Sequence, residues 1–284
     1  MAEITFLSRL TGSFATSAAQ NPTVAIMEAA FRDAGLDCRY INCEVPPEHL
    51  GGAVTGAVGM GWMGFNCSIP HKVAVLEHLD ELAPSAAIIG AVNCVVIRDG
   101  RLIGENTDGQ GFVASLRTVT DPAGQDVVVL GAGGAARAIA VETALAGARS
   151  ITVVNRTAER GEALATLIDT RTAAAGSYVP WTPEFGIDAG VGVVINATSI
   201  GFHPNTDAIP DIDLATLREG VVVADVVANP PRTGFLRAAE ERNCVTLDGL
   251  GMLVNQAVIA VRLWTGQDVS GAVMREVLED LFGA

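Results

Sequence analysis

The spacing of hydrophobic positions changes along the chain and predicts alternating strands and helices. Apolar positions three or four residues apart predict a helix from Pro22 to about Gly35, and another is expected after Pro70. Asp99-Gly100 between two apolar runs is a two-residue turn signal and predicts a hairpin. The strands expected in this first third lie at residues 4–7, 39–43, 62–69, 91–98 and 101–104.

The pattern becomes stronger in the second half. A helix is expected from Ala135 to about Ala146, capped by Gly147, and helices are expected again at 252–265 and after Val273. Continuous apolar runs are typical of parallel strands that are buried on both faces. They predict strands at 127–130, 151–154, 191–195 and 221–224.

These elements indicate an α/β fold class: an N-terminal α/β domain with a mixed sheet, then a doubly wound Rossmann domain. The polar stretch from Thr118 to Gln125 predicts the boundary between them. We expect a first domain at 1–115, a second at 116–245, and C-terminal helices at 246–284 that return to the first.

Glycines lie directly between the strand at 127–130 and the helix that follows. Gly131, Gly133 and Ala136 occupy the three small positions of the dinucleotide-binding fingerprint, in the strand–turn–helix context that supports it. Glycines let the pyrophosphate approach the backbone, and the helix N-terminus supplies N–H donors. The expected cofactor-binding residues of this loop are Gly131, Ala132, Gly133, Gly134 and Ala135.

The residues after the next strand predict which dinucleotide binds. An acidic residue there would accept hydrogen bonds from the ribose hydroxyls of NAD and repel a 2′-phosphate. The chain instead has Asn155, Arg156 and Thr157, with Arg160 one turn later. Two guanidinium groups with two neutral polar groups predict a clamp for the 2′-phosphate of NADP, and Arg156 can also stack on the adenine.

Charge and composition exclude several other functions. The formal net charge of −14 disfavours nucleic acid and anionic membranes as partners. Five scattered cysteines indicate reduced thiols, and we expect a cytoplasmic protein without a signal peptide or membrane span. His71 and His78 lack further ligands, so no metal site is expected. The sequence does not distinguish a monomer from a homodimer.

Several separate motifs resemble the shikimate dehydrogenase family, in the order in which that family carries them. The glycine loop at 131–137 and the Asn-Arg-Thr triplet resemble its cofactor domain. The segment at 64–72 is similar to its G-x-N-V-T-x-P-x-K motif, with Ser68 in place of a threonine. Further matches are Gly90-Ala91-Val92-Asn93, Gly104-Glu105-Asn106-Thr107-Asp108-Gly109, Asn196-Ala197-Thr198-Ser199, and Asp248 to Leu253 with Gln256.

The resemblance implies an NADP-dependent oxidoreductase that interconverts 3-dehydroshikimate and shikimate, a ring acid. Lys72 and Asp108 are implied as the catalytic pair at the substrate hydroxyl, where Lys72 either shuttles the proton or orients the hydroxyl. The implied substrate-binding residues are Ser68, Asn93, Thr107 and Gln256. Thr198, Ser199, Val226, Gly249 and Met252 would border the nicotinamide. Asn66 and Asn106 are expected to bind substrate or to brace their loops.

Two departures from the family pattern fall on the side of the substrate carboxylate. The family's paired serines are not reproduced in Gly12–Pro22, where Thr16, Ser17 and Asn21 are the candidates to replace them, and we take Ser17 as substrate-binding. Ala228 stands where the family tends to carry a tyrosine. Quinate or another cyclitol is therefore an alternative substrate. A sensor that binds NADP and a ring acid without turnover is a second alternative, although it would not need Lys72 and Asp108.

Overall fold

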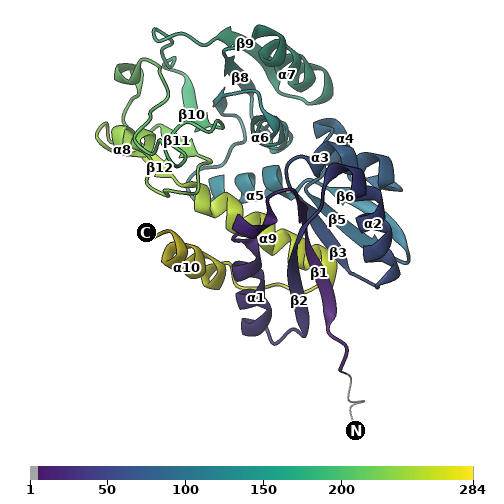
Figure 1. Cartoon of the computed structure of the whole chain (residues 1–284). Coiled ribbons are helices and arrows are strands. Elements are labelled where there is room, and N and C mark those ends of the chain that lie inside the picture. The colour runs from purple at the N-terminus through teal and green to yellow at the C-terminus, as the bar shows by residue number, and fades with distance from the viewer. Residues whose placement is uncertain (1–5, 284) are drawn as a thin grey trace. The chain divides into compact units, whose positions relative to one another are not determined.

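The computed structural model describes residues 6–283 and divides the chain into two compact units (Figure 1). Unit 1 comprises residues 1–107 and 257–278, and unit 2 comprises residues 108–256 and 279–284. The strand expected at 4–7 lies partly outside the described residues. For residues 6 and 7 the prediction is wrong, because Phe6 and Leu7 are exposed and the first pairing between strands begins at Arg9.

Unit 1 contains a six-stranded mixed sheet, as predicted, in the order β2-β1-β3-β5-β6-β4. Strand β1 is parallel to β2 and β3, whereas β5 is antiparallel to β3 and β6. The predicted hairpin is present, and both Asp99 and Gly100 have positive φ, as its tight turn requires. The strands are β1 (Arg9–Ala15), β2 (Cys38–Glu44), β3 (Gly64–Cys67), β4 (Glu81–Leu82), β5 (Cys94–Arg98) and β6 (Arg101–Glu105).

The core of unit 1 forms where this sheet packs against helices. Phe14 and Phe65 stack with ring centroids 4.4 Å apart, and Trp264 donates a hydrogen bond from Nε1 to the Val95 carbonyl at 3.0 Å. A Cβ on Gly64 would lie 2.3 Å from that indole nitrogen, so only glycine fits there. The helices of this part are α1 (Thr23–Asp33), α2 (Leu50–Gly59), α3 (His71–Ala74) and α4 (Pro84–Ile89), with 3₁₀ turns at Ala18–Gln20, Pro47–His49 and Val75–His78.

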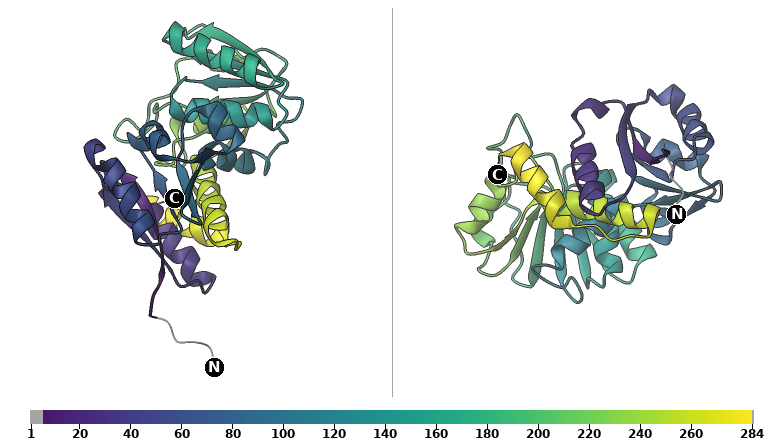
Figure 2. Two further views of the ribbon diagram at one scale, coloured as in Figure 1. Left: turned by 90° about the vertical axis from the view of Figure 1, so that its right-hand side faces the viewer. Right: turned by 90° about the horizontal axis from the view of Figure 1, so that it is seen from below.

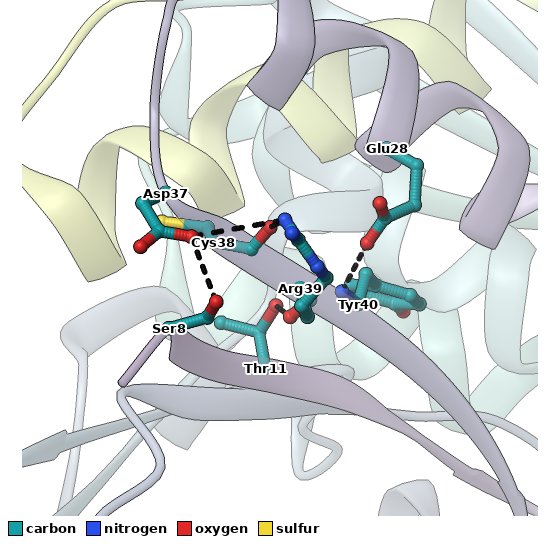
Figure 3. A network of polar contacts seen from close by, with 7 residues as sticks. All are labelled: Ser8, Thr11, Glu28, Asp37, Cys38, Arg39 and Tyr40. Carbon is teal, nitrogen blue, oxygen red and sulfur yellow. Dashed lines mark hydrogen bonds and ion pairs between the residues drawn. The ribbon is translucent and has the colours of Figure 1, made fainter. Parts of the chain in front are cut away.

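Strand β2 lies at an edge of the sheet, and polar side chains bind its backbone (Figure 3). The Tyr40 N–H donates to the Glu28 carboxylate at 2.6 Å, which satisfies a donor that an edge strand would otherwise expose. Thr11 donates to the Arg39 carbonyl, and Ser8 donates to the Asp37 carboxylate. The first of these contacts links β2 to α1, and the other two link the amino-terminal parts of β1 and β2.

Unit 2 contains a fully parallel sheet in the order β12-β11-β10-β7-β8-β9, which confirms the doubly wound prediction. The strand order reverses between β7 and β10, and ligands of such sheets bind at that point, beyond the carboxyl ends of the strands. The strands are β7 (Asp126–Leu130), β8 (Ser150–Asn155), β9 (Ala175–Pro180), β10 (Val191–Asn196), β11 (Val222–Asp225) and β12 (Val245–Leu247).

The helices of the remaining chain are α5 (Thr107–Leu116), α6 (Gly134–Leu145), α7 (Ala158–Arg171), α8 (Gly234–Glu240), α9 (Gly249–Thr265) and α10 (Gly271–Phe282), with a 3₁₀ turn at Leu214–Thr216. Figure 2 shows α9 and α10 in yellow as consecutive helices near the C-terminus. Residues of both helices are divided between the two units. No helix formed by residues 6–283 is long and apolar enough to cross a membrane.

Candidate cofactor and substrate sites

The glycine loop lies at the switch point of the unit 2 sheet, directly after β7. Gly131 has φ +107°, and a Cβ there would lie 2.9 Å from Thr198 Cγ2 and 3.2 Å from the Ala197 carbonyl. Glycine is therefore required by both the backbone conformation and the packing. In contrast, a Cβ on Gly133 or Gly134 would meet no atom within 4 Å. The N-terminus of α6 is thus open to a phosphate group.

A pocket of about 330 Å³ lies beside this loop within unit 2. Ala132, Gly133 and Gly134 line one side, and Arg137, Arg160, Ala163 and Leu164 line the other. Burial lowers the pKa of the Arg137 guanidinium below its ordinary value. The pocket therefore combines N–H donors of a helix N-terminus with arginines on two helices, which suits the phosphates of a dinucleotide.

The proposed 2′-phosphate clamp lies at the carboxyl end of β8. Asn155 donates from its side chain to the Thr157 carbonyl at 2.8 Å, which holds the turn between β8 and α7. The side chains of Arg156, Thr157 and Arg160 are exposed. The Arg156 guanidinium carbon lies 5.4 Å from the ring centroid of Trp181, a residue that the sequence interpretation did not select.

Strands β10 and β11 place the residues predicted to border the nicotinamide. Thr198 donates to the Asn196 side-chain oxygen at 2.7 Å, and Asn196 donates in turn to Asp225 at 3.0 Å. The Val226 N–H donates to the Asn196 carbonyl. A Cβ on Gly249 would lie 2.5 Å from the Val227 carbonyl, so glycine lets the start of α9 approach β11. Thr198, Val226 and Gly249 thus lie in neighbouring segments of unit 2.

Ser199 and Met252 complete this predicted set. Ser199 is exposed and lines a pocket of about 370 Å³ with the loop that follows it, residues 200–205 and Ala208. Met252 is half-buried in the first turn of α9. A place in the cofactor site and a place in the surrounding core are both compatible with this exposure, so the assignment of Met252 stays a prediction.

A network of neutral polar side chains lies in unit 1, centred on Asn93. The Thr107 N–H donates to Asn93 Oδ1 at 2.6 Å, and Asn93 Nδ2 donates to Thr107 Oγ1 at 3.0 Å. Asn66 donates to the Asn93 carbonyl and Asn106 donates to the Ala91 carbonyl, both at 3.0 Å. Asn66 and Asn106 therefore brace the backbone of the segments that carry the predicted substrate-binding residues.

Lys72 lies on the short helix α3, next to the same network. Its carbonyl accepts from the Val92 N–H at 2.8 Å, and its side chain is half-buried. The neighbouring His71 is fully buried, and its Nε2 lies 2.7 Å from the Val45 carbonyl, which requires a proton on Nε2. Ser68 is half-buried, and its N–H donates a hydrogen bond to the Phe14 carbonyl, which fixes the position of its backbone.

The segment that replaces the family's paired serines follows β1. Thr16 and Ser17 are exposed, and Asn21 Oδ1 accepts from the Thr23 N–H at the start of α1. Asn42 on β2 donates to the carbonyls of Ala18 and Asn21, both at 3.0 Å. The amide groups therefore hold the fold of this segment, and its exposed hydroxyls belong to Thr16 and Ser17.

Asp108 and Gln256 belong to helices of unit 2. Asp108 is half-buried in the first turn of α5. A Cβ on Gly111 would lie 2.6 Å from the Gln256 backbone nitrogen, so α5 packs closely against α9. Gln256 is buried and donates from Nε2 to the Leu253 carbonyl at 3.0 Å.

Three family models match the chain. The model of the shikimate dehydrogenase substrate binding domain matches residues 14–95, and that of shikimate/quinate 5-dehydrogenase matches residues 114–179. The model of the shikimate 5′-dehydrogenase C-terminal domain matches residues 249–279. A protein of Methanopyrus kandleri named shikimate dehydrogenase (NADP(+)) is 42% identical over 268 residues, which are 90% of each chain. The chain belongs to the shikimate dehydrogenase family.

Two solved structures are similar to the chain over nearly its whole length. The ligand-free 5-ketofructose reductase of Gluconobacter sp. strain CHM43 is 58% identical, with a TM-score of 0.96 over 98% of this chain and 100% of that one. The shikimate 5-dehydrogenase of Thermus thermophilus, in complex with NADP(H) and shikimate, is 32% identical, with a TM-score of 0.84 over 96% and 99%. The prediction of a family of NADP-dependent oxidoreductases is confirmed.

Arg137 and Trp181 lie beside the predicted cofactor-binding residues, and the sequence interpretation did not assign either of them. Arg137 ends the glycine-rich motif, so its position in the sequence could have indicated it. Trp181 follows the edge strand β9, which had no apolar pattern to predict it. Among residues 6–283 there is no group of three His, Cys, Asp or Glu side chains that could hold a metal ion.

Proposed function

We propose that this family member is an NADPH-dependent reductase of a neutral polyhydroxylated ketone, the class to which 5-ketofructose belongs. The observation that carries the proposal is the segment after β1. There is no cation from Gly12 in β1 to Pro22, and Asn42 uses both amide hydrogens to hold the Ala18 and Asn21 carbonyls. A substrate carboxylate would find the exposed hydroxyls of Thr16 and Ser17 there and no cation, and a charge without a cationic partner in a cleft is costly.

Two further observations support a neutral substrate. The net charge of −14 repels anionic ligands wherever no local basic group compensates it. The solved structure that is 58% identical is that of a 5-ketofructose reductase. The hydroxyls of Thr16 and Ser17, with Ser68, Asn93, Thr107 and Gln256, are a neutral hydrogen-bonding set that matches a polyol.

The cofactor residues are proposed with this reaction. Gly131 to Ala135, with the N-terminus of α6, would hold the pyrophosphate. Asn155, Arg156, Thr157 and Arg160 would hold the 2′-phosphate, and Thr198, Ser199, Val226, Gly249 and Met252 would border the nicotinamide. The open backbone at Gly133 and the arginine-lined pocket support this fit. NADPH, when bound, supplies the hydride.

Lys72 and Asp108 are proposed to serve the substrate oxygen. Reduction of the carbonyl carbon gives an alkoxide oxygen that must gain one proton, and Lys72 would donate or direct it, with Asp108 as the second residue of the proposed pair. Residues 92 and 93 support this assignment, because Val92 binds the Lys72 backbone and Asn93 binds Thr107, the residue before Asp108. The same pair disfavours a role as a sensor without turnover.

The second candidate is the reduction of 3-dehydroshikimate. The curated relatives favour it, since proteins about 40% identical, such as that of Methanothermobacter thermautotrophicus at 40% over 276 residues, are named shikimate dehydrogenase (NADP(+)). A cytoplasmic location is proposed as well, supported by five free cysteines.

Initial rates of NADPH oxidation separate the candidates. With purified protein, we expect kcat/KM for 5-ketofructose to exceed that for 3-dehydroshikimate by at least about tenfold, or about 1.4 kcal/mol in transition-state stabilisation. Shikimate and quinate with NADP⁺ provide the reverse assay. A higher kcat/KM for 3-dehydroshikimate would reject the neutral substrate, and the absence of turnover with all four, while NADP still binds, would reject the enzyme.

A further inference from the structure

Trp181 lies beside the clamp because β8 and β9 are parallel neighbours. Asn155, the last residue of β8, pairs with Pro180, the last residue of β9. The Trp181 N–H continues this pairing by donating to the Asn155 carbonyl at 3.2 Å. Arg156 and Trp181 are therefore the first residues beyond two adjacent strand ends.

The indole ring is held in one orientation. Its Nε1–H donates to the Asp211 carbonyl at 2.7 Å, and the partly buried ring packs against the core cluster that contains Val194, Ile212 and Leu217. A ring fixed at its polar end and along its apolar face is a rigid surface.

Arg156 lies against this surface. The guanidinium carbon is 5.4 Å from the ring centroid, within the range of a cation–π contact. Arg156 is otherwise an exposed side chain, and an exposed arginine loses much rotamer freedom when it binds a ligand. Contact with the ring restricts that freedom beforehand. A guanidinium carries five N–H donors, and a cation–π contact with the ring leaves N–H groups of Arg156 that can donate to a phosphate.

We propose that Trp181 is a positioning residue for recognition of the NADP 2′-phosphate. Its ring holds Arg156 at the end of β8 before the cofactor binds, so that Trp181 acts through Arg156 and contributes to the preference for NADP over NAD. The inference rests on the proposed function in one respect, namely that Arg156 binds the 2′-phosphate. It does not depend on which ketone is reduced.

The test is a set of dissociation constants measured by calorimetry, without turnover. The variants are Trp181→Leu, Trp181→Phe, Arg156→Gln and the double variant Trp181→Leu/Arg156→Gln. The ligands are NADP⁺, NAD⁺ and 2′,5′-ADP, the last of which carries the 2′-phosphate without the nicotinamide. Trp62→Phe, in unit 1, is the matched control for loss of a tryptophan, and thermal unfolding of each variant reports on its fold.

We expect Trp181→Leu to raise the Kd of NADP⁺ and 2′,5′-ADP about two- to fivefold, the range of an exposed cation–π contact. The Kd of NAD⁺ should change by less than about twofold. Trp181→Phe keeps an aromatic face and should retain most of the affinity even if it unfolds at a lower temperature. In the Arg156→Gln background, Trp181→Leu should have no further effect on NADP⁺, because its effect passes through Arg156.

Three results would overturn the inference: an unchanged Kd of NADP⁺ in Trp181→Leu, an equal loss for NAD⁺, or the same loss in the Arg156→Gln background. Either of the last two results would show that Trp181 stabilises the end of β9 and does not act through Arg156. Failure of the proposed clamp gives a different result, since Arg156→Gln alone would then leave the Kd of NADP⁺ unchanged.

Discussion

Lys72 is the only lysine in the chain, so every other basic side chain except histidine is an arginine. Guanidinium groups do not release a proton in proteins, whereas an ammonium group does. Lys72 is therefore the one basic side chain besides the four histidines that can exchange a proton with a substrate oxygen. Its place beside the Asn93–Thr107 network agrees with that role.

Replacement of Lys72 by Met keeps the length and apolar stem of the side chain and removes the amine. We expect kcat to fall by about 100-fold or more, the usual contribution of general acid–base catalysis, with the Kd of NADP⁺ within about twofold of the parent. Steady-state kinetics and calorimetry measure the two quantities. An unchanged kcat would remove Lys72 from the mechanism.

Reductive methylation gives an independent test, because Lys72 and the N-terminal amine are the only primary amines of the chain. Methylation keeps the charge and crowds the nitrogen. It should lower the turnover of the parent protein, while the residual turnover of Lys72→Met should not respond to it.

Single residues differed in how far the sequence could predict them. Gly131 and the residues Asn155 to Thr157 were predictable because each directly follows a strand that its apolar pattern reveals. The position of Trp181 beside the clamp was not predictable. Trp181 contacts Arg156, 25 residues earlier in the sequence, only because β8 pairs with β9. The hydrogen bonds of Asn42 to the Ala18 and Asn21 carbonyls were not predictable either, because they also join residues that are distant in the sequence.

The element with the most specific demands is the turn from β7 into α6. Gly131 needs glycine for the fold, whereas Gly133 has φ −84° and open space around its Cβ position, so the fold alone would accept alanine there. The fold therefore requires glycine at position 131, whereas a substitution at Gly133 tests cofactor binding alone.

Gly131→Ala should lower stability by about 1–3 kcal/mol, because it forces a side chain into a positive φ and against Thr198. Gly133→Ala should leave stability within about 0.5 kcal/mol and still weaken NADP⁺ binding, since the methyl group would stand where the pyrophosphate approaches the backbone. Denaturant unfolding and calorimetry measure these effects. Normal NADP⁺ affinity in a stable Gly133→Ala protein would contradict the cofactor loop.

The end of β11 contains a buried carboxyl group with a pH-dependent effect on stability. Burial raises the pKa of Asp225 to about 6 from an ordinary value of 3.8, although Val227, Thr233 and Asn196 each donate a hydrogen bond to it. The folded state therefore binds more protons than the unfolded state between these two values, and stability falls as the pH rises through that window.

Comparison with Asp225→Asn isolates this group, because asparagine has the same shape and does not titrate. The free energy of unfolding of the parent, relative to that of the variant, should decrease by up to about 3 kcal/mol between about pH 4 and pH 7. Urea unfolding at a series of pH values measures it. A flat difference, or one that increases with pH, would contradict the raised pKa.

Elements were predictable where the hydrophobic pattern is regular. Strands β7, β8, β10 and β11 are apolar runs buried on both faces, and their positions followed from that pattern. Strand β9 did not, because it lies at a sheet edge with exposed positions at Ala175, Ser177 and Pro180. The short strands β4 and β12 and helices α4 and α5 gave too few apolar positions for a periodicity to be seen.

At the scale of the whole molecule, the family and the substrate are separate questions. The residues of the glycine loop, the Asn93–Thr107 network and Lys72 match the family, and its models cover both units of the chain. The segment after β1 is where the chain departs from the family pattern. It lacks the family's paired serines, and the side chains of Asn21 and Asn42 fix its backbone by hydrogen bonds. A protein can therefore keep the cofactor and the proton chemistry of its family while it accepts a substrate without a carboxylate.

A competition assay shows directly which of the two ketones the protein prefers. Equal concentrations of 5-ketofructose and 3-dehydroshikimate are incubated with a limiting amount of NADPH and the unmodified protein, and the reduced products are quantified by NMR. The product ratio equals the ratio of the two kcat/KM values. We expect the reduced sugar to exceed shikimate by at least about tenfold. An excess of shikimate would contradict it.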